Sequence, residues 1–90
     1  MKSCIQIRAE DNVANVLEAT RKDELLTVVG VKSDAVVTAA EDLRRFHKIA
    51  VLDIAKGADV VRDGYIIGRA MSAIRCGEWV HIHNLESKRA

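Results

Sequence analysis

A short repeated motif in the second half of the chain restricts the fold more than any other feature of the sequence. The segment DIAKGADVV at residues 53–61 is followed by AIRCGEWVH at residues 73–81, with isoleucine, glycine and valine at matching positions. A weaker third copy, DLRRFHKIA at residues 42–50, has Phe46 at the glycine position. In each copy, polar residues lead to a turn position, which is usually a glycine because glycine accepts positive φ. Apolar residues at every second position follow the turn. Each copy is therefore predicted to be a turn that leads into a β-strand.

The glycines of this half divide residues 49–85 into pieces that suit short strands and are too short for ordinary helices. Further strands are predicted at residues 4–8, 25–31 and 36–38, with a turn at residues 32–34. Residues 12–17 fit either a strand or a short helix, and residues 39–45 fit a helical turn. The sequence thus predicts a mainly β single domain over residues 1–90, with at most one or two short helical turns.

The segment from Trp79 to His83 alternates between aromatic and aliphatic residues and is predicted to be a strand. Side chains of a strand point alternately to opposite faces, so Val80 and Ile82 are expected on one face. Trp79, His81 and His83 are then expected together on the other face, with the two imidazoles about 6.5 to 7 Å apart along the backbone. Asn84 follows directly.

Composition excludes several classes of function. The 14 basic and 13 acidic residues give a net charge of +1 and are spread along the chain, so binding to nucleic acid or to an anionic membrane is not expected. No run of about eighteen apolar residues is present, and the N-terminus has no apolar signal segment, which predicts a cytoplasmic protein. Aromatic residues make up only 3% of the chain, so the core must be aliphatic, and a partner surface would help such a small core.

The motifs in this half resemble a known family. HKIAVLDI from His47, DG-x-x-IG at residues 63–68 and I-x-x-GEWVHIHN at residues 74–84, together with DNVAN at residues 11–15, are similar to the SAF-type β-clip module of the altronate and galactarate dehydratases. That family includes the small subunit of (2R)-sulfolactate sulfo-lyase. The chain departs from the family in having no proline, and Arg44, Arg45 and Phe46 stand where the family has a proline and a glycine.

The resemblance implies a small SAF-like β-clip domain that is the small subunit of a metal-dependent lyase, or else a domain excised from a longer dehydratase. The expected reaction is dehydration of a sugar acid such as altronate, and the chain alone is expected to be inactive. The resemblance implies no cofactor in this chain and a divalent metal, iron or manganese, in a large catalytic partner subunit. Two alternatives remain open: the small subunit of a sulfolactate sulfo-lyase that releases sulfite, or a β-clip binding and assembly module without enzyme activity. A homo-oligomer is also compatible with the sequence.

Six residues are the candidate site residues. His81, His83 and Asn84 are expected to line the rim of an active site completed by another chain, and His47 and Lys48 to bind the substrate, because lysine and histidine can meet a carboxylate. Alternatively, these histidines are surface or interface residues, or His81 and His83 hold a metal with His47 or Glu78 as third ligand. Trp79 is expected either to anchor a partner or to lie in the core with its N–H satisfied internally.

The remaining charged residues are predicted to have structural roles. Asp53, Asp59 and Asp63 lie at turns of the repeat, where capping hydrogen bonds explain them better than catalysis does. The basic pairs at residues 44–45 and 88–89 are predicted to be solvated or docking surface.

Overall fold

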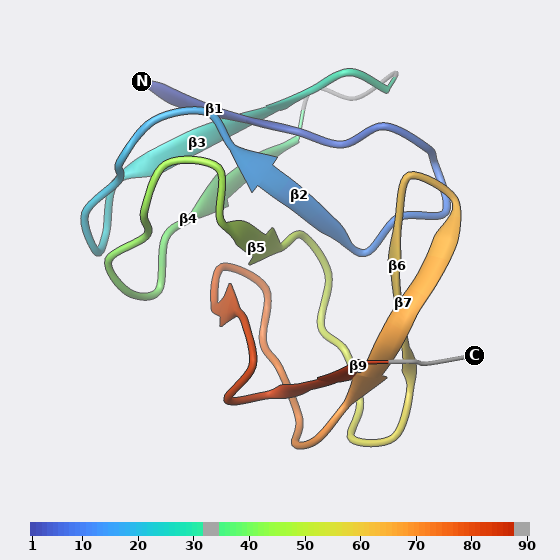
Figure 1. Ribbon diagram of the computed structural model, residues 1–90. Helices are drawn as coiled ribbons and strands as arrows, with labels where there is room; N and C mark the ends of the chain where they lie inside the picture. The colour runs from blue at the N-terminus through green and yellow to red at the C-terminus, as the bar shows by residue number, and fades with distance from the viewer. Residues whose placement is uncertain (32–34, 88–90) are drawn as a thin grey trace.

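The computed structural model describes residues 1–31 and 35–87, and these residues form two β-sheets (Figure 1). The six-stranded sheet has the order β4-β3-β1-β2-β5-β8, and the three-stranded sheet has the order β6-β7-β9. The strands are β1 Lys2–Ile5, β2 Val13–Val16, β3 Leu25–Val29, β4 Val36–Thr38, β5 Lys48–Ala50, β6 Asp59–Arg62, β7 Tyr65–Ala70, β8 Trp79–Val80 and β9 Leu85–Ser87. The predicted mainly β, β-clip fold is confirmed for these residues, which form curled sheets and include no helix.

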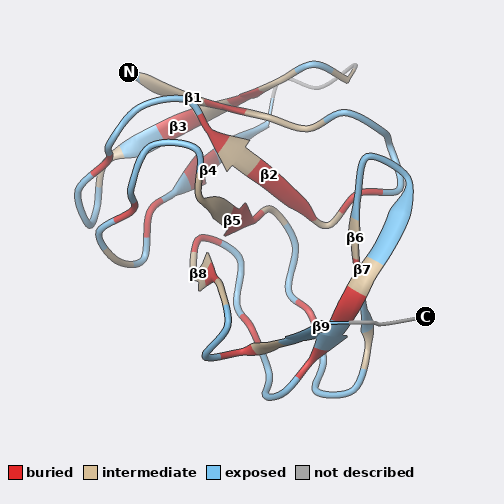
Figure 2. Ribbon diagram, viewed as in Figure 1, coloured by how far each residue is buried: buried red, intermediate tan, exposed pale blue. Residues whose placement is uncertain are grey.

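The core has two parts, one within the larger sheet and one between the sheets. The first packs side chains of β1 to β5, including Leu26, Val28 and Ile49. The second joins Val13 and Val80 of the larger sheet to Val60 and Ala70 of the smaller one. Figure 2 shows the buried stretches of β2, β7 and β8 that supply this second part. Both parts are aliphatic, as the composition predicted.

The repeated motif forms the same turn wherever it occurs. In the copies at residues 42–50, 53–61 and 73–81, the residues with positive φ are Phe46, Gly57 and Gly77, at 68°, 83° and 96°. Each of these residues donates its backbone N–H to a carbonyl of a distant segment, at 2.6 to 2.8 Å. The weak third copy is therefore a true copy, although a bulky residue is strained in this backbone region.

A fourth copy, which the sequence did not reveal, begins at Thr20. Its positive-φ residue is Asp23, at 75°, and aspartate tolerates this conformation better than most residues. The four turns form two pairs: Thr20 bridges Leu43, and Ile54 bridges Ile74, each through two backbone hydrogen bonds of 2.7 to 2.9 Å. The domain thus contains two equivalent pairs of turns.

Acidic side chains accept backbone N–H groups at matching positions in both pairs of turns. Asp42 accepts the backbone N–H of Lys22 at 2.9 Å, and at the matching place Asp53 accepts that of Cys76 at 2.8 Å. Glu78 accepts the backbone N–H of Arg75 at 2.8 Å, as Glu24 does for Arg21. The predicted capping role is confirmed for Asp53.

Of the two alternatives for residues 12–17, the strand is confirmed, because the main chain of β2 pairs with β1 and β5. Other secondary-structure predictions were wrong. Residues 39–45 form a bridge and a turn instead of a helical turn. The strands predicted at 4–8 and 25–31 are shorter, ending at Ile5 and Val29. The strand predicted to run to His83 ends at Val80, because His81 accepts backbone N–H groups from Asn84 and Leu85 in a turn. The turn predicted at residues 32–34 lies outside the described residues.

A buried carboxylate joins the loop after β1 to the β6–β7 hairpin. Asp11, only 1% exposed, accepts backbone N–H groups from Arg8, Asp63 and Gly64 at 2.8 to 3.0 Å. Burial raises its pKa, but the backbone hydrogen bonds from Gly64, Arg8 and Asp63 outweigh this, so the pKa lies below its ordinary value. Asn12 adds two hydrogen bonds to β6, with Asp59 and Val61, at 2.9 and 2.8 Å.

Two glycines with the same backbone conformation should respond differently to substitution. A Cβ at Gly57 meets nothing within 4 Å, whereas at Gly77 it lies 2.2 Å from the carbonyl oxygen of Thr38. We expect Gly57→Ala to cost about 1 kcal/mol from the positive φ alone, and Gly77→Ala about 2 to 4 kcal/mol because of the added overlap. Urea unfolding of both variants measures the difference, and equal losses would contradict this account.

The Asp11 carboxylate should stabilise the fold in a pH-dependent way. Asp11→Asn replaces one acceptor oxygen with an NH2 that faces backbone donors, so we expect a loss of about 1 to 3 kcal/mol near neutral pH. Because the folded pKa is lowered, the wild-type advantage is present above the ordinary carboxylate pKa and disappears as the pH falls through the folded value. Urea unfolding near neutral pH and at about pH 3 tests this, and a difference that grows in acid would contradict it.

Candidate functional site

The predicted site residues meet at the free edge of the six-stranded sheet. β8 is the edge strand and pairs with β5, with Trp79 opposite Ile49 and Val80 opposite Lys48. His47 immediately precedes β5, and His81 and His83 lie in the turn that follows β8. Short segments from two copies of the repeat thus bring together residues that are far apart in the sequence.

The three histidines gather around Trp79. The Trp79 ring lies 5.0 Å from the His81 ring, nearly parallel at 11°, and 5.0 Å from the His83 ring at 40°. His47 lies 5.7 Å from Trp79 and 5.2 Å from His81, between ring centroids. The indole Nε1–H of Trp79 donates to His47 Nδ1 at 3.1 Å. We call His47, Trp79, His81 and His83 the aromatic cluster.

The cluster forms, but not through the predicted strand alternation. Ile82 was expected beside Val80 on one face; instead Val80 is buried and Ile82 is 77% exposed, because the chain turns after Val80. The turn brings His81 and His83 back toward Trp79. The side chains come together as expected, but the predicted backbone was wrong.

Asn84 fixes the shape of this turn. The residue is 7% exposed, its Oδ1 accepts the backbone N–H of His81 at 2.9 Å, and its amide nitrogen donates to the carbonyl of Trp79 at 2.8 Å. Both polar atoms of the side chain are therefore engaged by the main chain. Asn84 holds the aromatic cluster in place, and a direct contact with substrate stays a prediction.

The charged groups that shift the pKa of His81 are all basic. Partial burial lowers the pKa of His81 below its ordinary value, and nearby basic groups lower it further. These groups are His47, Lys48, His83 and Arg44. Burial also lowers the pKa of Lys48, with a further contribution from Arg62. Among the described residues, neither Lys48 nor Arg44 takes part in an ion pair, so the site presents positive charge that can meet an anion.

The described residues do not gather three histidine, cysteine, aspartate or glutamate side chains in a position to hold a metal ion. Glu78, a candidate third ligand for His81 and His83, instead accepts the backbone N–H of Arg75. The site brings imidazoles together with the cations Lys48 and Arg44.

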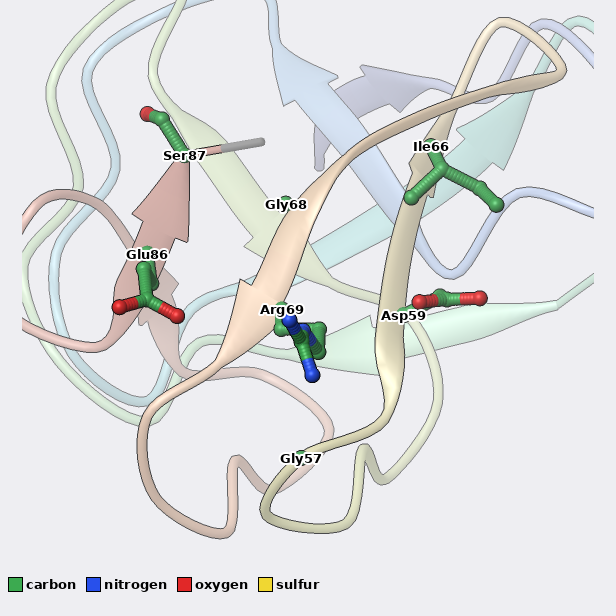
Figure 3. A pocket seen from close by; sticks show the side chains of 7 residues that line it. All are labelled: Gly57, Asp59, Ile66, Gly68, Arg69, Glu86 and Ser87. Carbon is green, nitrogen blue, oxygen red and sulfur yellow. The ribbon is translucent and has the colours of Figure 1, made fainter. Parts of the chain in front are cut away.

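One hollow in the surface lies away from the aromatic cluster. A cavity of about 290 Å³ crosses β6, β7 and β9, where Arg69 lies between Asp59 and Glu86 (Figure 3). It contains none of the predicted site residues.

Sequence reasoning missed one contributor to the site and the two residues that link the sheets. Arg44 was assigned to a solvated pair, yet it lies close enough to His81 to affect its pKa. Asp11 and Asn12 join the two sheets, and their only sequence signal was the DNVAN segment. The basic pair at residues 88–89 lies outside the described residues.

Comparison with known proteins agrees with this architecture. Residues 2–88 match the family model for the altronate/galactarate dehydratase SAF domain. The chain belongs to this family. The SAF domain is 37% identical over 87 residues to altronate dehydratase of Bacillus subtilis and 41% identical over 80 residues to that of Escherichia coli. These matches cover 97% and 89% of the chain.

The SAF domain corresponds to only a part of these enzymes, 17% of the B. subtilis protein and 15% of the E. coli protein. It is also 44% identical over 43 residues to (2R)-sulfolactate sulfo-lyase subunit alpha of Chromohalobacter salexigens, a match that covers 48% of this chain and 46% of that subunit. The described residues include no helix that is long and apolar enough to cross a bilayer.

His81 should titrate below the ordinary range of a histidine. We expect its NMR titration midpoint to lie lower than that of free histidine, because protonation would place a cation in a partly buried, basic surrounding. In Lys48→Met the midpoint should move back up, since one neighbouring charge is gone. Tyr65→Phe at the β6–β7 turn is the control and should leave it unchanged. A midpoint that does not respond to Lys48→Met would rule out this electrostatic cause.

Proposed function

We propose that this chain is the small, site-completing part of a metal-dependent lyase that dehydrates a sugar acid such as altronate. In this proposal His81 and His83 stand at the rim of an active site shared with a large catalytic subunit. His47 and Lys48 contact the substrate there. In this proposal the divalent metal, iron or manganese, belongs to the large subunit.

The aromatic cluster is the observation that supports this proposal most. The His47 and His81 rings lie 5.2 Å apart, and the His81 and His83 rings each lie 5.0 Å from Trp79 at the sheet edge. Lys48 lies beside them and has no acidic partner among the described ion pairs. A sugar acid carries a carboxylate and several hydroxyls, and these need cations and hydrogen-bonding groups. The edge of β8 offers both kinds of group.

The chemistry of such a lyase explains why histidines are useful here. The reaction removes a proton next to a carboxylate and expels a β-substituent, so it needs a group that accepts a proton and one that donates a proton. The lowered pKa of His81 favours the neutral imidazole, which can accept a proton. The positive charges of Lys48 and Arg44 stabilise the negative charge that develops on the substrate.

A second candidate is the small subunit of a sulfolactate sulfo-lyase. The similarity to subunit alpha of that enzyme supports it, since the 43 matched residues are 46% of a subunit about as long as this chain. In this alternative the same site acts on sulfolactate, and sulfite leaves instead of water.

Affinity capture from the source cells decides between these candidates. The tagged chain is used as bait, and the captured complex is assayed with altronate, galactarate and sulfolactate in the presence of iron or manganese. Recovery of a large subunit together with dehydration of a sugar acid would support the first proposal, and release of sulfite would support the second. Failure to retain any large subunit would contradict both and favour a stand-alone binding module.

The paired variant His81→Ala, His83→Ala tests the shared site directly. Both side chains are at least partly exposed, so the fold should be retained, while turnover of the assembled enzyme should fall about 100-fold or more, as for loss of proton-transfer groups. Steady-state kinetics at saturating large subunit measures the loss. Tyr65→Phe is the matched control and should keep full activity. Wild-type turnover in the double variant would exclude the shared-site role.

A further inference from the structure

Trp79 is the residue that connects all three histidines of the chain. It stacks on His81, lies tilted against His83 and donates its indole hydrogen to His47. Its own backbone is fixed, because it pairs with Ile49 in the sheet and its N–H donates to the Glu41 carboxylate at 3.0 Å. The indole is thus a rigid support for three side chains that the proposed function uses.

The hydrogen bond from Trp79 decides where His47 carries its proton. An indole nitrogen can only donate, so Nδ1 of His47 must be the acceptor and carry no hydrogen. In the neutral ring the proton is then on Nε2. Nε2 has no hydrogen bond within the described residues. Since no buried side-chain nitrogen or oxygen there lacks a partner, Nε2 reaches solvent and can donate to an incoming molecule.

We propose that Trp79 is a positioning residue: it holds His47 with Nε2–H as a fixed, outward-facing donor for a carboxylate or hydroxyl oxygen of the substrate. This inference rests on the proposed function and adds to it the orientation of one donor. It also gives Trp79 a role that differs from anchoring a partner subunit. Docking needs the area of the ring, whereas positioning needs its N–H.

Nitrogen-15 NMR of the chain alone tests the first step, at a pH where the histidines are neutral. In the wild type we expect an unprotonated Nδ1 and a protonated Nε2 for His47, with a coupling across the hydrogen bond to Trp79. In Trp79→Phe the coupling is lost, and the two nitrogen signals move toward each other as both proton placements become populated. His83→Gln removes a ring that touches Trp79 without touching the hydrogen bond, so His47 should keep its wild-type signals. Unchanged His47 signals in Trp79→Phe would overturn the proposal.

Kinetics of the assembled enzyme test the second step. Phenylalanine keeps much of the ring but has no donor, so Trp79→Phe should assemble with the large subunit as tightly as wild type. Its KM should rise about three- to tenfold, as for a weakened hydrogen bond to a charged group. Weakened assembly with a normal KM at saturating large subunit would show a docking role and overturn the positioning role.

The two proposals fail in different ways. Suppose that the double variant His81→Ala, His83→Ala loses turnover while the Trp79→Phe variant keeps a wild-type KM. In that case the positioning inference fails and the shared-site proposal stands. If both variants have wild-type kinetics, the shared site fails as well, even where the NMR signals of His47 change as expected.

Discussion

The fold depends on one hydrogen bond that is repeated in each turn of the motif. A residue with positive φ turns its backbone N–H toward a carbonyl of a segment distant in the sequence, and the next residues enter a strand. Asp23, Phe46, Gly57 and Gly77 all do this, at 2.6 to 2.8 Å. Without these turns the short strands would have no fixed partners, because strands of two to six residues have few ladder hydrogen bonds of their own.

The two sheets are joined by burial and by one carboxylate. The aliphatic cluster between the sheets supplies non-directional stabilisation, which by itself leaves their relative orientation free. Asp11 and Asn12 fix the relative orientation of the two sheets, because their hydrogen bonds reach the β6–β7 hairpin from the loop before β2. A charged acceptor of three backbone N–H groups is stable in a buried place only because every oxygen has a donor.

The aromatic cluster is a consequence of the same architecture. The turn before β5 positions His47. The pairing of the edge strand β8 with β5 positions Trp79. The turn that Asn84 stabilises positions His81 and His83. Three separate local structures therefore meet at one sheet edge. Under the proposed function, this edge is where the chain meets substrate and the large subunit.

The sequence by itself determined the strand-rich class, the aliphatic core, the family and the residues that gather beside β8. These follow from local chemistry: glycine spacing, β-branched content and a dense motif around GEWVHIHN. Tertiary structure decided the rest. Phe46 and Asp23 take positive φ because distant carbonyls hold their N–H groups, which no local preference predicts for phenylalanine. The chain turns at His81 because Asn84 reaches back to residues 79 and 81, overriding a pattern that alone favours a longer strand. The proton of His47 is placed by a tryptophan 32 positions away in the sequence, so only the folded chain could reveal it.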